Sequence, residues 1–154
     1  MRPQASTPPI VRGLLAGAAG TAALDAVTYL DMATRGRPAS TTPERSVERL
    51  TKAGHLSLGT GDSAGNRRSG LGALLGYLTG ATVAAGYSAL VGRRLPWGAT
   101  AVLLGAAAMV GSDAPLTMLK VTNPRNWSAA DWASDVVPHL AYGAVAAMVL
   151  DRLR

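Results

Sequence analysis

An uncharged stretch of the chain, residues 69–92, is long enough to cross a membrane as a helix. A bilayer core is about 30 Å thick, and about 20 apolar residues in helical conformation span it. Within this stretch Gly72, Gly76 and Gly80 recur every fourth residue and therefore share one helix face. Rows of small residues let helices approach closely in lipid, where packing drives association. The stretch predicts an integral membrane protein with a helix that packs through its glycine face.

Three further apolar segments complete the predicted fold, an all-α integral membrane bundle of four transmembrane helices in a single domain over residues 1–154. The third segment begins at Trp97, which favours a membrane interface. The last helix begins with a capping-box pattern, Ser128 and Asp131, and Trp127 and Trp132 have the spacing of a hydrophobic staple. The expected spans are about 10–32, 70–91, 97–119 and 132–152.

The first of these segments has a close-packing face of its own at Gly13 and Gly17. Its alternative interpretation is a cleaved signal peptide, because Arg2 and Arg12 accompany an Ala-rich run. We favour a span, since the run is only weakly hydrophobic and Asp25 follows it.

The polar segment 34–69 is the one sizeable part expected outside the membrane, and it holds the mean hydropathy down to +0.18. Pro43 and Glu44 form a helix-start signal, so we expect a short interfacial helix over about 43–53. The glycine-rich run 59–65 has the spacing of neither phosphate-binding fingerprint, and we interpret it as a flexible linker.

Charge and composition narrow the class of protein further. The absence of cysteine removes disulfides and thiolate metal sites from consideration. The net charge is +6, and the basic residues lie mostly beside the apolar segments, where anionic headgroups lie. We therefore expect the lipid bilayer as partner and no nucleic acid. More basic residues lie on the side of loops 34–69 and 120–131 than on the side of the termini, which favours external termini.

Ionisable residues inside a span are costly and therefore functional candidates; here they are Asp25, Asp113, Asp135 and His139. A helix rises about 1.5 Å per residue, so Asp25 and Asp113 lie roughly 22–24 Å from the side of the termini. His139 lies roughly 10 Å below the opposite face, which is nearly the same depth in a core of about 30 Å. Asp135 precedes His139 by one turn. We predict one polar layer that binds a proton or a cation.

The first and third spans also align with each other. Gly105 and Asp113 follow Gly17 and Asp25 by 88 residues each, which suggests two related helical hairpins. Pro115 and Pro138 would free backbone carbonyls near Asp113 and His139 as further oxygen ligands or proton acceptors. The alternative for the polar residues is structural: hydrogen bonds between membrane helices, worth about 1 kcal/mol each.

Two short stretches also suggest a family. The first is Gly13-Leu14-Leu15-Ala16-Gly17, followed after the span by Arg37-Pro38 and Pro43. The second is residues 134–142, with an acidic residue, a histidine and an aromatic residue in the last span. Both resemble the small bacterial inner-membrane proteins of the YagU type. The resemblance implies a multi-pass protein of the bacterial cytoplasmic membrane, associated with tolerance of acid stress and with no assigned reaction.

The sequence contains no catalytic motif, and we expect a non-enzymatic protein without a cofactor or a resident metal. The favoured function is proton- or cation-linked transport, or acid-stress sensing, through the Asp/His layer. One alternative is an accessory subunit whose glycine faces bind a second copy of the chain or a larger membrane complex. A second alternative is a membrane enzyme with an Asp/His metal site.

Overall fold

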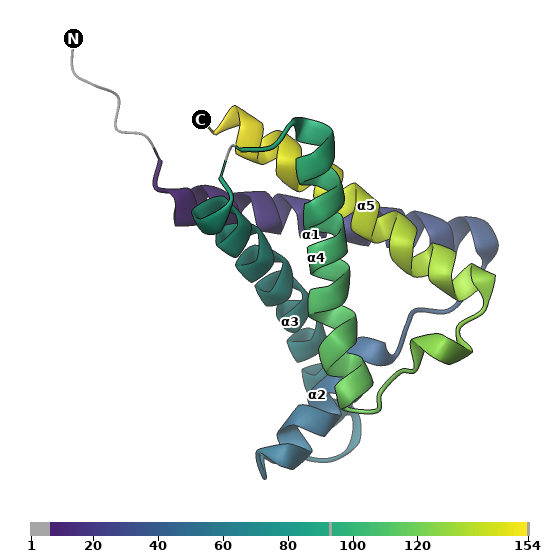
Figure 1. Ribbon diagram of the computed structural model, residues 1–154. Helices are drawn as coiled ribbons and strands as arrows, with labels where there is room; N and C mark the ends of the chain where they lie inside the picture. Colours follow the sequence, from purple (N-terminus) through teal and green to yellow (C-terminus); the bar gives the residue numbers. More distant parts are fainter. Residues whose placement is uncertain (1–6, 93, 154) are drawn as a thin grey trace.

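The computed structural model describes residues 7–92 and 94–153, which form five α-helices, one short 3-10 helix and no strand. The predicted all-α class is confirmed. Arg2, on which the signal-peptide interpretation partly rests, lies outside the described residues. In order, the elements are α1 (Pro9–Arg35), α2 (Thr42–Ala53), α3 (Gly61–Leu90), α4 (Trp97–Met118), η1 (Pro124–Asn126) and α5 (Ala129–Arg152) (Figure 1).

Four of these helices, α1, α3, α4 and α5, are long and apolar enough to cross a membrane. The chain is therefore a multi-pass membrane protein built as a four-helix bundle, with α2 as the short helix expected in the polar segment. The flexible linker expected over 59–65 is largely absent, because α3 already begins at Gly61. Arg67 fixes the approach to this helix by donating a 2.7 Å hydrogen bond to the carbonyl of Leu58.

The long helices lie close together at one end of the bundle and diverge at the other. The starts of α1 and α4 and the ends of α3 and α5 gather on the side of the termini, whereas α2 and η1 mark the opposite, widened end (Figure 1). α1 packs mainly on α3 and α5, and α4 packs mainly on α5. The bundle is therefore two tightly crossed pairs, α1 with α3 and α4 with α5, joined through α1 and α5.

Glycines bring α1 and α3 into backbone-to-backbone contact. A Cβ atom on Gly17 would collide with the carbonyl of Gly80 and with Ala81, and one on Gly13 would collide with Ala84 and its neighbour. Such contacts are possible only where side chains are missing, so the glycine pattern sets where the two helices cross.

The second pair, α4 and α5, crosses in the same register. A Cβ on Gly105 would meet the His139 carbonyl oxygen at 2.7 Å, and one on Gly143 would collide with the Ala101 carbonyl. Positions in α4 follow those in α1 by 88 residues, and positions in α5 follow those in α3 by 59. By these offsets, the contact of Gly17 with Gly80 in the first hairpin (α1 with α3) corresponds to the contact of Gly105 with His139 in the second hairpin (α4 with α5). The contact of Gly13 with Ala84 corresponds in the same way to the contact of Ala101 with Gly143. The two hairpins thus share one packing geometry.

Two of the predicted packing glycines, Gly72 and Gly76, lie away from this crossing. Gly72 is covered by Pro43 of α2. At Gly76 the prediction of packing within the chain is wrong: a Cβ built there meets no atom within 4 Å, so no described helix covers it, and packing on a partner stays a prediction. Gly76 lies between two covered positions, Gly72 under α2 and Gly80 against α1 and α5.

The buried interior is thin and made mostly of small residues. Tyr142 and Leu104 are its largest fully buried side chains. The Tyr142 hydroxyl donates a 2.6 Å hydrogen bond to the Gly80 carbonyl, and its ring occupies the space that Gly20 leaves open. Many large apolar side chains are exposed, as expected where lipid replaces water around the bundle; Met118, for example, is 83% exposed.

Local sequence signals set the start of α5. Ser128 and Asp131 form the predicted capping box, and the rings of Trp127 and Trp132 meet edge to face with centroids 4.9 Å apart. Pro138 lies inside α5, as Pro115 lies inside α4.

The crossing geometry predicts opposite outcomes for the same substitution at two glycines of the first hairpin. Gly17→Leu should lower the free energy of unfolding by about 1–3 kcal/mol or more, because the added side chain must push α1 away from the Gly80 carbonyl. Gly76→Leu is the matched control and should leave that free energy unchanged or slightly higher, since leucine favours helix. Unfolding of the purified protein in detergent measures both; equal losses at the two positions would contradict the crossing.

The element order also predicts the membrane topology. Reporter fusions at Gly61 and Arg125 should lie on one side of the membrane, and fusions at Arg94 and Arg152 on the other, because two spans separate Gly61 from Arg125. Activity of a side-specific reporter at each position measures this. Opposite sides for Gly61 and Arg125 would contradict four spans.

Candidate functional site

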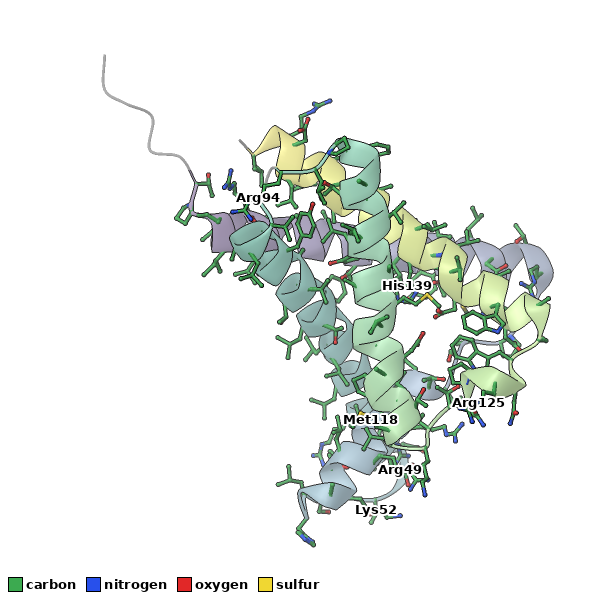
Figure 2. The ribbon with its side chains drawn as sticks, viewed as in Figure 1. Arg49, Lys52, Arg94, Met118, Arg125 and His139 are labelled. Carbon is green, nitrogen blue, oxygen red and sulfur yellow. The ribbon has the colours of Figure 1, made fainter. Side chains whose placement is uncertain are left out.

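A cluster of polar side chains joins α4 and α5 just beyond their close crossing. It consists of Ser112 and Asp113 of α4 and Asp135 and His139 of α5, and Figure 2 shows His139 between the two helices. Only 12% of the His139 side chain and 22% of the Asp135 side chain are exposed. The cluster therefore lies within the apolar part of the bundle, at the level where α4 and α5 begin to diverge.

The imidazole of His139 has polar contacts at both ring nitrogens. Its Nδ1 lies 2.8 Å from the backbone carbonyl oxygen of Asp135 and 3.5 Å from Oδ1 of the same residue, so both partners are acceptors. Its Nε2 faces Ser112 Oγ at 3.4 Å. Ser112 has one hydroxyl proton, which it can donate to the Met109 carbonyl at 2.9 Å. Nδ1 therefore faces acceptors, and Nε2 faces a hydroxyl group that can either donate or accept.

The two carboxyl groups of the cluster face each other across the helix pair. The side chains of Asp113 and Asp135 lie within hydrogen-bonding reach. Asp135 Oδ2 is buried and has no donor among the described residues. Two ionised carboxylates offer only acceptors and repel each other, so a proton held between them would relieve the repulsion. If one proton is shared and the imidazole is protonated, the charges of the three side chains sum to zero.

Asp25, the fourth residue of the predicted layer, has a different partner. Its side chain is hydrogen-bonded to Tyr77 of α3. Because α1 packs on α3 and α5, the structure gives Asp25 no described contact with Asp113 or His139. The structure thus brings together three of the four predicted residues, and the equal depth of the fourth does not make it a neighbour.

The carbonyls freed by the two prolines are not the acceptors that the cluster uses. His139 instead bonds the carbonyl of Asp135, and Ser112 bonds that of Met109. Sequence reasoning missed Ser112 and Tyr77 as partners of the carboxyl and imidazole groups. The one signal for Ser112 was its position next to Asp113; nothing in the sequence marked Tyr77.

The first hairpin crosses its two helices with glycines at the positions that correspond to Asp135 and His139. By the 59-residue offset, Asp135 and His139 occupy the positions that Gly76 and Gly80 occupy in α3. The first hairpin nevertheless makes the same backbone crossing. Two close glycine contacts are therefore sufficient for this geometry, and the carboxyl–imidazole cluster is an addition to the second hairpin.

Among the described residues, no group of three or more His, Cys, Asp and Glu side chains is arranged to hold a metal ion. Comparisons with protein-family models, curated proteins and solved structures found no match. The resemblance to YagU-type proteins therefore stays a prediction.

Proposed function

We propose that the chain is a small, non-enzymatic protein of the bacterial cytoplasmic membrane that binds a proton at Asp113, Asp135 and His139 and uses it for proton-linked transport or acid sensing. The observation that carries the proposal is the contrast between the hairpins. The same helix crossing forms with glycines in the first hairpin and with Asp135 and His139 in the second. Ionisable groups that a membrane fold does not need are costly, and a function explains why they are present.

The proton would act through the net charge of the cluster. With the shared proton the cluster is neutral, and without it a net negative charge remains inside the bundle. An unpaired charge at this depth is unfavourable, so loss of the proton favours either entry of a cation or separation of α4 from α5. The helices already diverge directly beyond the cluster (Figure 1), which makes α4 the element that such a charge change would move.

One observation favours the accessory-subunit alternative. Gly76 is exposed on α3 with open space around it, although the glycine row that contains it serves close packing elsewhere. A second helix from another chain would fit such a position. The metal-enzyme alternative finds no suitable group of ligands among the described residues.

Infrared spectroscopy of the reconstituted protein tests the shared proton. Difference spectra between acidic and alkaline buffer should contain a carbonyl band of a protonated carboxyl group. Asp113→Asn and Asp135→Asn should each abolish this band, because one proton lies between the two side chains. Asp25→Asn, at the equivalent position of the first hairpin, is the matched control and should retain it.

Two results would contradict the proposal. One is a band that survives both Asn substitutions in the second hairpin. The other is loss of folding in both variants, because asparagine keeps the size and hydrogen bonding of aspartate; the cluster would then serve only to hold α4 and α5 together.

A further inference from the structure

The outward face of α2 carries a cluster of basic side chains. Arg45, Arg49 and Lys52 recur at helical spacing with Glu48 and together line a shallow hollow of about 200 Å³. All four side chains are exposed. Figure 2 shows Arg49 and Lys52 at the widened end of the bundle, opposite the end that holds Arg94. We call these three cations the α2 basic face.

The other side of α2 fixes this face at a defined depth. Ser46 and Val47 are buried, with 2% and 5% exposure. Pro43 covers Gly72 of α3, and Ser69 Oγ donates a 2.9 Å hydrogen bond to the carboxylate of Glu44. The uncharged part of α3 begins at Ser69, directly after two arginines. The first turn of α2 is thus attached where the hydrocarbon of the membrane begins, which is the level of the lipid headgroups.

The cations of the α2 basic face lack the partners that neighbouring cations have. Arg35 and Arg37, at the end of α1, both pair with Asp31. No carboxylate among the described residues forms an ion pair with Arg45, Arg49 or Lys52. Unpaired cations at headgroup level are attracted to anionic lipids.

Exposed apolar side chains lie on the same segment as these cations. Leu50 of α2 is 46% exposed, and Leu56, just after the helix, is 68% exposed. Leu50 lies on the side of α2 that carries Ser46 and Val47, away from the cations, so in a membrane it meets acyl chains while the cations meet headgroups; a soluble anion would satisfy the cations alone. We propose that the α2 basic face binds the phosphodiester headgroup of an anionic phospholipid and so anchors the widened end of the bundle at the membrane surface.

Native mass spectrometry of the full-length protein, released from detergent, tests this proposal with two lipids. Phosphatidylglycerol adducts should exceed phosphatidylcholine adducts, and the preference should weaken as salt is added before analysis. Arg45→Gln combined with Arg49→Gln should weaken phosphatidylglycerol binding about tenfold or more, since each cation near an anionic surface contributes about fivefold.

A matched double variant separates the α2 basic face from general surface charge. Lys120→Gln with Arg125→Gln removes two cations from the loop between α4 and α5, on the same membrane side, and should leave the lipid preference nearly unchanged.

Three results would overturn the proposal. An equal loss in both double variants would overturn it in favour of unspecific charge. Competition by soluble glycerophosphoglycerol at lipid-like concentrations would overturn it in favour of a soluble anion. Equal binding of both lipids by the unmodified protein would overturn it in favour of a solvated helix face.

Discussion

Contact between helix backbones at glycine is the interaction on which the rest of this structure depends. Gly17 meets the Gly80 carbonyl, and Gly105 meets the His139 carbonyl. In lipid no hydrophobic force drives helices together, so stability comes from dispersion contacts that only close approach supplies. Few large side chains are buried in this chain, and Tyr142 and Leu104 are the main ones. The two crossings therefore set the position of every other element.

Because the helix crossing is repeated, the two hairpins of the chain can be compared position by position. Two hairpins with one packing geometry carry different side chains at equivalent positions: glycines in α3 where α5 has Asp135 and His139. The aspartates at equivalent positions of α1 and α4 also differ in their partners, since Asp25 bonds a tyrosine and Asp113 faces a second carboxyl group. The fold is shared between the hairpins, and the carboxyl–imidazole cluster of Asp113, Asp135 and His139 lies in the second.

Sequence patterns predicted the helices well because length and hydropathy alone determine a spanning helix. They also identified Gly13, Gly17 and Gly80 as positions of close packing. They placed Asp113 and His139 at one level of the bundle, where the structure brings them together. They could not predict which neighbour each face meets. The depth of a residue follows from the rise per residue of its helix. Which neighbouring helix its side chain faces depends instead on the angle at which the helices cross. This angle separates Asp25 from the cluster and leaves Gly76 uncovered. Glycines at the start of α3 likewise suggested a linker, although the chain there is helical and held by Arg67.

The account's central claim is that backbone contact, and not the polar cluster, holds α4 to α5. The most direct measurement compares the free energy of unfolding of two variants of the second hairpin in detergent. Gly105→Val should lower it sharply, since any side chain there collides with the His139 carbonyl. The double variant Asp135→Ala with His139→Ala should stay folded, with a much smaller loss. The reverse order, with the alanine variant unfolded and Gly105→Val stable, would contradict the account.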